Sequence, residues 1–205
     1  MEFDCIVIGA GLSGLTTSRE LERAGRSVLL IESSDDVGGR VRSDQIDGYI
    51  CDRGFQVINP KYPQVAKSGV LKDLDFKKIS GSIRLFDQDI KIGYEFGYEL
   101  GSLSNKSGPL AEKLRFLEFI CNRKVLNSQN FGFYTKNFPH FYNLALNPFL
   151  SGVFLTDPRE ISADVAQQIL RSFIRSLPGI PARGVGEFSK ALAKPIRNLH
   201  LNEKV

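Results

Sequence analysis

The amino-terminal stretch that ends at Glu32 contains the pattern that most restricts how this chain can fold. A short apolar run at residues 3–8 leads into the glycine-rich turn GAGLSG of residues 9–14, and a helical pattern follows over residues 12–24. Gly25 is a candidate terminator for this helix, and a second apolar run at residues 27–31 precedes Glu32. Strand, glycine turn, helix, strand and acid in this order indicate a βαβ unit that binds a dinucleotide. We expect residues 3–8 to form a strand that is buried on both faces of a parallel sheet.

Each residue of the glycine turn has a physical role in this interpretation. Gly9 allows the tight turn out of the strand, Gly11 lets a pyrophosphate approach the backbone, and Gly14 lets the helix pack closely on the sheet. Free N–H groups at the start of the helix, together with the helix dipole, favour phosphate. Glu32 stands at the end of the second apolar run, where a carboxylate can accept hydrogen bonds from ribose hydroxyls. The predicted cofactor-binding residues of the turn are Gly9, Ala10, Gly11, Leu12, Ser13 and Gly14.

A second glycine pair follows the acidic residue and bears on the kind of dinucleotide. Gly38 and Gly39 let another backbone segment approach the phosphates, and Arg40 supplies a planar cation that can bind phosphate oxygens bidentately. The fingerprint of a nicotinamide dehydrogenase does not require this pair. The segment therefore favours a flavin dinucleotide, and the alternative is an ordinary loop with solvated arginines.

Two blocks of the sequence resemble a known protein family. The first spans residues 4–60, from DCIVIGAGLSGL through VGGRVRSD to the run DRGFQV at residues 52–57. The second comprises PFLSGVFL from Pro148 and LPGIPARGVGEFSKALAKPI from Leu177. These blocks are similar to the amino-terminal half of the flavin amine oxidase and phytoene desaturase superfamily, which also contains the protoporphyrinogen oxidases.

The resemblance implies FAD as the cofactor and assigns residues to its parts. The backbone of residues 9–14 would hold the pyrophosphate, Glu32 would bind the adenosine ribose, and Ser33 would lie near the adenine. The loop of Gly38, Gly39 and Arg40 would contact the phosphates or the ribityl chain. The residues expected close to the isoalloxazine are Gly54, Phe55 and Gln56, for which a buried turn between two strands is the alternative.

The resemblance also implies the fold class and the domain organisation. We expect an α/β protein with a Rossmann-type FAD-binding domain formed by residues 1–75 and 182–205, and an inserted α+β substrate region at residues 76–181. Family members are usually at least twice as long and complete the flavin pocket with a late Gly-Asp segment that this sequence lacks. The fold is therefore expected to be truncated relative to the family. The sequence leaves open a fragment, a split gene with a complementing carboxy-terminal half, and a short variant.

The middle of the chain is less informative. Residues 82–92 predict two short strands around a turn, and residues 110–125 predict a helix. Residues 131–154 are rich in Phe and Tyr. This segment is interpreted as an aromatic core, with a tunnel for a large apolar substrate or a membrane-contacting face as the alternative.

Composition excludes several other classes of protein. The net charge is only +4 and no dense Lys/Arg run is present, so a nucleic-acid partner is not expected. The three cysteines are too scattered for a metal or redox site; Cys5 and Cys51 are expected to be small core residues. No secretory signal or membrane-spanning run is apparent, so we expect a cytoplasmic or plastid-stromal location. His140 and His200 are poor candidates for chemistry, and no catalytic side chain is assigned because the flavin would carry the difficult step.

Two functional hypotheses follow. The first is an FAD-dependent oxidoreductase, or the amino-terminal half of one, that oxidises a C–C or C–N bond of a small apolar isoprenoid- or tetrapyrrole-like substrate by hydride transfer to flavin. A flavin oxidase for a small amine is a less favoured variant. The second hypothesis is a non-catalytic binding protein on the same fold. The complete glycine fingerprint argues against the second hypothesis, and the short length argues for it.

Overall fold

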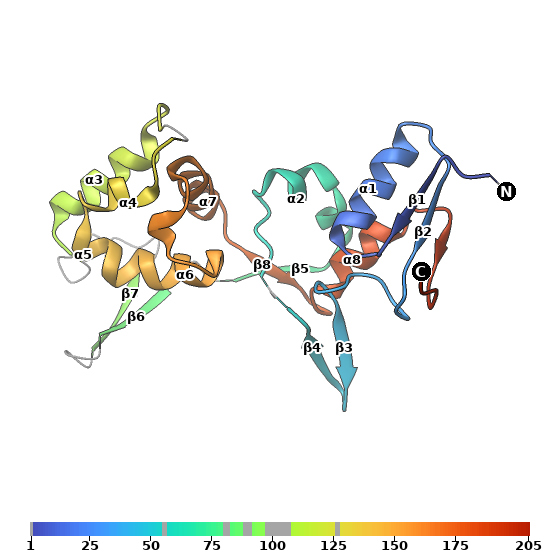
Figure 1. Ribbon diagram of the computed structural model, residues 1–205. Coiled ribbons are helices and arrows are strands. Elements are labelled where there is room, and N and C mark those ends of the chain that lie inside the picture. Colours follow the sequence, from blue (N-terminus) through green and yellow to red (C-terminus); the bar gives the residue numbers. More distant parts are fainter. Residues whose placement is uncertain (1, 55–56, 80–82, 88–91, 97–107, 126–127) are drawn as a thin grey trace. The chain divides into compact units, whose positions relative to one another are not determined.

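A computed structural model of the protein describes residues 2–54, 57–79, 83–87, 92–96, 108–125 and 128–205 (Figure 1). The chain divides into two compact units. The first consists of Met1–Ile79 and Ser176–Val205, and the second of Ser80–Arg175. The first unit is therefore built from both ends of the chain.

The first unit contains a parallel three-stranded sheet. Its strands are β1 (Cys5–Ile8), β2 (Val28–Ile31) and β9 (Leu199–His200), in the order β1-β2-β9. Cys5 pairs with Val28 at one end of the first ladder, and Leu30 pairs with Leu199 in the second. The strand close to the carboxyl end of the sequence thus joins a sheet that β1 and β2 begin.

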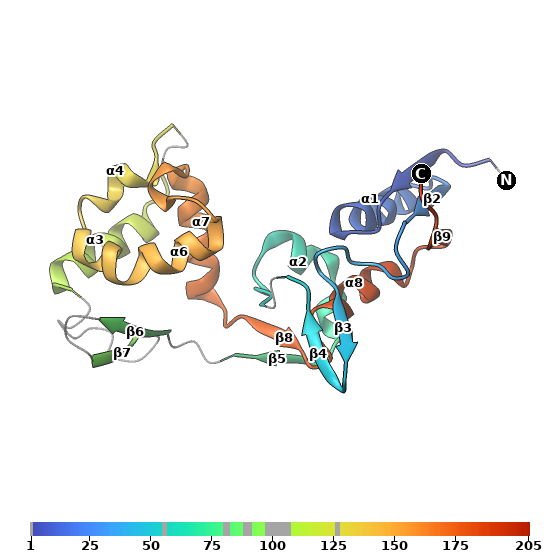
Figure 2. The same ribbon diagram turned by 60° about the horizontal axis from the view of Figure 1, so that its bottom comes forward.

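Two helices pack on one face of this sheet. Helix α1 (Leu12–Arg23) connects β1 to β2, and helix α8 (Gly186–Ala193) packs beside it (Figures 1 and 2). Helix α1 ends at Arg23 with Ala24 as its C-cap, and Gly25 follows with φ of 80°, in the left-handed conformation that makes glycine common after a helix. The βαβ unit that the sequence predicts is therefore present.

The prediction that the first strand is buried on both faces is wrong. Val7 faces the core formed with α1 and α8, whereas Ile6 and Ile8 are 62% and 67% exposed. Successive side chains of a strand point to opposite faces, and both helices lie on the face that carries Val7. Within the described residues, the opposite face of β1 has no covering layer.

We expect the double substitution Ile6→Thr, Ile8→Thr to change the free energy of unfolding by less than about 1 kcal/mol, because both side chains are already in water. Threonine also keeps the strand propensity of a β-branched residue. Leu30→Ala is the control: Leu30 is fully buried, so its truncation should cost about 2–5 kcal/mol. Urea unfolding measures the free energy of unfolding of both variants. A loss for the double variant as large as that for Leu30→Ala would contradict the exposed face.

The rest of the first unit extends from this sheet. A hairpin of β3 (Ser43–Ile46) and β4 (Tyr49–Asp52) turns through Asp47 and Gly48, both at positive φ, as in the tight turns typical of hairpins. The remaining elements are α2 (Pro63–Ser68), the 3-10 turn η1 (Val70–Asp73), and the antiparallel pair β5 (Phe76–Lys78) and β8 (Gly179–Pro181). Cys51, expected in the core, is exposed because it lies on this projecting hairpin; Cys5 is partly buried.

The second unit is mainly helical. An antiparallel pair, β6 (Ile83–Asp87) and β7 (Ile92–Phe96), precedes the helices. The helical elements are α3 (Leu110–Cys121), α4 (Phe131–Thr135), α5 (Pro139–Phe141), the π-helical turn η4 (Tyr142–Leu146), α6 (Asn147–Phe154), the 3-10 turn η5 (Pro158–Glu160) and α7 (Ala163–Arg175). The second strand lies later than expected, and α3 ends at Cys121, before the predicted Val125.

The aromatic-rich segment forms the core of the second unit. Phe131, Phe138 and Phe141 are buried and pack with Phe116 and Phe119 of α3 at ring-centroid distances of 5.1–6.3 Å. The core interpretation therefore holds for these side chains. Of the described helices, none is both long and apolar enough to cross a membrane.

Candidate cofactor site

The site begins at the amino end of α1, where the helix has no cap from a side chain. Gly9 adopts φ of 93° and donates its N–H to the Ile31 carbonyl at 2.7 Å, which turns the chain away from β1. Gly11 is the N-cap residue, and the first helical turn contains no acidic side chain. The amides that open a helix lack partners within the helix and carry the positive end of its dipole, so this end suits an anion.

Gly11 and Gly14 lie in different surroundings. A Cβ atom built on Gly14 would lie 1.8 Å from the Gly9 carbonyl oxygen, so the close approach of α1 to β1 requires glycine there. A Cβ built on Gly11 would meet nothing within 4 Å. Gly14 therefore serves the packing of α1 on β1, and Gly11 borders open space at the helix end.

The Glu32 carboxylate is fixed against the glycine turn. Its Oε2 accepts the Ala10 N–H at 2.7 Å, and its Oε1 accepts the N–H and hydroxyl of Ser34 at 2.8 and 2.7 Å. The Ser33 hydroxyl donates to Oε1 at 3.3 Å, and the Ser33 side chain is exposed. Burial raises the pKa of the Glu32 carboxyl, but the hydrogen bonds from Ser34, Ala10 and Ser33 outweigh this effect, so the pKa lies below its ordinary value of 4.5.

Because the pKa of Glu32 is lower in the folded than in the unfolded state, its ionised form stabilises the fold above pH 4.5. This contribution is lost as the pH falls through the folded-state pKa. We expect Glu32→Gln to lower the thermal unfolding midpoint near neutral pH and to have progressively less effect as the pH is lowered below 4.5. Other carboxylates titrate in both proteins and cancel in the difference. A gap between the two proteins that stays constant with pH would contradict the role of the Glu32 charge.

The twin-glycine loop lies directly against the glycine turn. Gly38 donates its N–H to the Ala10 carbonyl at 2.8 Å and forms a parallel bridge with Gly11. Gly38 and Gly39 both have positive φ, and a Cβ on Gly39 would lie 3.6 Å from the Gly11 Cα. Two glycine segments that are well separated in the sequence are thus in contact beside the amino end of α1.

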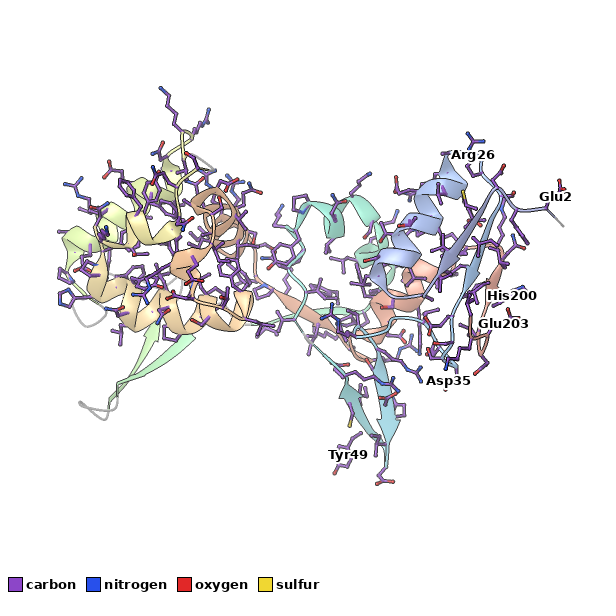
Figure 3. The ribbon with its side chains drawn as sticks, in the orientation of Figure 1. Glu2, Arg26, Asp35, Tyr49, His200 and Glu203 are labelled. Atoms are coloured by element: carbon purple, nitrogen blue, oxygen red, sulfur yellow. The ribbon has the colours of Figure 1, made fainter. Side chains whose placement is uncertain are left out.

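Arg40 is the cation available beside this contact. Its side chain is exposed, and it forms no ion pair with any other described residue. The neighbouring basic side chains are engaged: Arg42 pairs with Asp35 at 2.8 Å, and Arg53 binds Asp44 through two hydrogen bonds of 2.6 and 2.8 Å. Asp35 lies on the loop that follows β2 (Figure 3). Asp35 and Asp44 therefore have basic partners, while the Arg40 guanidinium has no acidic partner among the described residues.

The structure brings most of the predicted site residues together. Gly54 packs against Arg40, since a Cβ on Gly54 would lie 2.5 Å from the Arg40 carbonyl oxygen. Phe55 and Gln56 lie outside the described residues. The residues that meet around the amino end of α1 are Gly9, Ala10, Gly11, Leu12, Ser13, Gly14, Glu32, Ser33, Gly38, Gly39 and Arg40.

Sequence reasoning missed the supports of this site. Ser34 holds the Glu32 carboxylate, and only its position after the acid could have indicated this. Asp52 accepts the Val185 N–H at 3.0 Å, and Ser43 accepts the Gly186 N–H at 2.8 Å, so the hairpin caps the amino end of α8. These contacts join residues from opposite ends of the chain, and no local pattern predicts them.

Each of the two histidines has a ring nitrogen in contact with an acidic side chain. His140 is 2.7 Å from Glu112 in the second unit, and His200 is 3.1 Å from Glu203 near the end of the chain (Figure 3). In the part of the chain that the structure describes, no three His, Cys, Asp or Glu side chains form a group that could hold a metal ion. The polar features that converge on one place are therefore those that suit an anionic nucleotide.

Comparison with known proteins also indicates a nucleotide-binding domain. The profile of the NAD(P)-binding Rossmann-like domain matches residues 7–74. A Mycobacterium tuberculosis protein named as a flavin-containing monoamine oxidase, AofH, is 44% identical over 57 residues, which cover 28% of this chain and 13% of that protein. Chloroplastic protoporphyrinogen oxidase 1 of Arabidopsis thaliana is 26% identical over 188 residues, which cover 80% of this chain and 32% of that protein.

Solved structures match nearly the whole chain. A putrescine oxidase bound to putrescine aligns with a TM-score of 0.68 and 23% identity, over 98% of this chain and 51% of that one. A RAB GDI from Plasmodium falciparum aligns with a TM-score of 0.67 and 16% identity, over 99% of this chain and 58% of that one. At these identities the matches show the fold alone. The chain spans about half the length of these structures. The profile match and the curated relatives show that the chain is similar to flavin amine oxidases and protoporphyrinogen oxidases, the superfamily that its motifs resemble.

Proposed function

We propose that the protein is an FAD-dependent oxidoreductase, or the amino-terminal half of one. The observation that carries this proposal is the uncapped amino end of α1, which opens beside the twin-glycine loop and the exposed Arg40 guanidinium. The Rossmann-like profile and the flavin-containing relatives indicate a flavin cofactor.

The residues of the site fit the parts of FAD. The diphosphate would take the space beside Gly11 and the amides of Leu12, Ser13 and Gly14, where no side chain competes for it. Glu32 would accept the ribose hydroxyls with the lone pairs left over from its bonds to Ala10 and Ser34, and Ser33 would lie towards the adenine. Gly38, Gly39 and Arg40 would contact the phosphates or the ribityl chain, and the segment that begins at Gly54 would approach the isoalloxazine.

When bound, FAD would accept a hydride from a C–C or C–N bond of the substrate, and this is the chemistry that the cofactor supplies. The residues of the chain would bind and orient the cofactor: the helix amides would hold the charged diphosphate, and Glu32 would fix the nucleoside. No catalytic side chain is proposed.

A tetrapyrrole- or isoprenoid-like apolar substrate is favoured over a small amine. The sequence similarity to protoporphyrinogen oxidase extends over 80% of the chain and so includes the second unit, whereas the sequence similarity to the monoamine oxidase is confined to 57 residues. A nucleotide-binding segment holds the cofactor and says little about the substrate, so the longer match carries more weight. A complementing carboxy-terminal half would supply the remainder of the relatives' length.

The alternative is a non-catalytic binding protein on the same fold. This alternative is kept because the short length of the chain favours it, and a protein named as a RAB GDI has the same fold. The open helix end and the intact glycine turn favour the enzyme, because a protein without a nucleotide has no need to leave them free.

Purified protein titrated with FAD should quench the flavin fluorescence and acquire a flavin absorption spectrum, and NAD should not compete. Protein that stays colourless after incubation with excess FAD and removal of the free FAD would overturn the proposal.

Protein with FAD bound, supplied with an artificial electron acceptor, is then tested with protoporphyrinogen and with putrescine. Turnover of the first supports the favoured substrate class and turnover of the second the amine oxidase variant. Bound flavin without turnover of either favours the binding protein.

A further inference from the structure

Ser189 of α8 lies beneath the twin-glycine loop, although the two are far apart in the sequence. Its side chain is fully buried, and its hydroxyl donates to the Val41 carbonyl at 2.6 Å. Gly38 packs on the same side chain, since a Cβ on Gly38 would lie 3.0 Å from both the Cβ and the Oγ of Ser189. The serine therefore contacts the loop at both of its ends.

The hydrogen bond from Ser189 ends on Val41, which closes the turn that shapes the twin-glycine loop. Val41 donates its N–H to the Gly38 carbonyl at 2.8 Å, so residues 38–41 form a closed turn that presents Gly39 and Arg40 outward. The carbonyl of Val41, the last residue of this turn, accepts the hydrogen bond from the Ser189 hydroxyl. A second link between α8 and the loop, from Lys190 to Asp36, measures 3.7 Å and is partly exposed, so it contributes little.

We propose that Ser189 is a positioning residue that holds the twin-glycine loop in the conformation in which Gly39 and Arg40 contact the cofactor phosphates. Without the hydroxyl, the Val41 carbonyl loses its partner and the turn can shift relative to the end of α1. The serine acts through the loop and does not touch the nucleotide. This inference rests on the proposed function, because it assumes that the loop binds a diphosphate.

The test compares Ser189→Ala with Ser172→Ala. Ser172 is a buried serine of α7 in the second unit, and its hydroxyl donates to the Ile169 carbonyl at the same distance of 2.6 Å. Both variants lose a bond from a buried serine hydroxyl to a backbone carbonyl, so both should show lowered unfolding midpoints. We expect the Kd for FAD to rise about tenfold for Ser189→Ala and to stay within about twofold of the parent for Ser172→Ala.

A second measurement separates positioning from general loosening of the fold. The Kd for ADP, which carries the diphosphate, should rise for Ser189→Ala, while the Kd for adenosine should not. An equal loss for ADP and adenosine, or an unchanged Kd for FAD, would overturn the inference. Ser189→Cys keeps the shape with a weaker donor and should give an intermediate Kd, which makes the test independent of the alanine variant. A parent protein that binds no FAD would overturn the proposed function itself.

Discussion

Replacing Gly11 with aspartate is expected to abolish tight FAD binding while leaving the protein folded. Gly11 has φ of −71° and ψ of 177°, an extended conformation that any residue adopts, and a Cβ there meets nothing within 4 Å. Aspartate is also a preferred N-cap, so the free energy of unfolding without cofactor should be unchanged or a few tenths of a kcal/mol higher.

The loss of binding has two causes that can be separated. The aspartate carboxylate would accept the amides that are otherwise free for phosphate, and its charge would repel the diphosphate. We expect the Kd for FAD to rise at least about a hundredfold, which corresponds to about 2.7 kcal/mol. Gly11→Asn has nearly the same shape and also caps the helix, but it carries no charge, so its effect should be smaller. Fluorescence titration gives both constants, and an Asp variant that binds FAD as tightly as the parent would place the diphosphate elsewhere.

The βαβ unit could be predicted from the sequence because its determinants are local. Two apolar runs, a glycine turn and a helix terminator all precede Glu32, and each specifies the conformation of its own neighbourhood. The contact of the glycine turn with the twin-glycine loop is not local, but it could be expected because both segments were predicted to bind one nucleotide. The aromatic segment could be assigned to a core because many large apolar side chains gathered in one segment need a common interior.

Other features depend on which parts of the chain meet, and no local pattern reports that. Residues 3–8 are as apolar as a strand covered on both faces, yet Ile6 and Ile8 are exposed because both packing helices lie on the side of Val7. The hydrogen bond from Ser189 to Val41 joins opposite ends of the sequence. A serine in an amphipathic helix has the same local pattern whether it faces a loop or solvent.

Substituting Gly14 with alanine is expected to cost at least about 3 kcal/mol of folding free energy, the upper part of the range for overpacking. The added methyl group would lie 1.8 Å from the Gly9 carbonyl oxygen and 3.1 Å from the Gly9 carbonyl carbon. Both are backbone atoms, so no side-chain rotation can relieve the clash, and α1 must move away from β1. That movement separates the helix amides from the twin-glycine loop, so FAD binding should be lost together with stability.

Gly152 provides the matched control, because it is also a helical glycine but a Cβ there meets nothing within 4 Å. Gly152→Ala should stabilise α6 by about 0.5–1 kcal/mol through helix propensity alone, without affecting FAD binding. The same chemical change thus has opposite signs at two helical positions, and the surroundings of the added carbon decide which. Urea unfolding of both variants measures the difference. A Gly14→Ala variant as stable as the parent would mean that α1 does not approach β1 as closely as the glycine fingerprint requires.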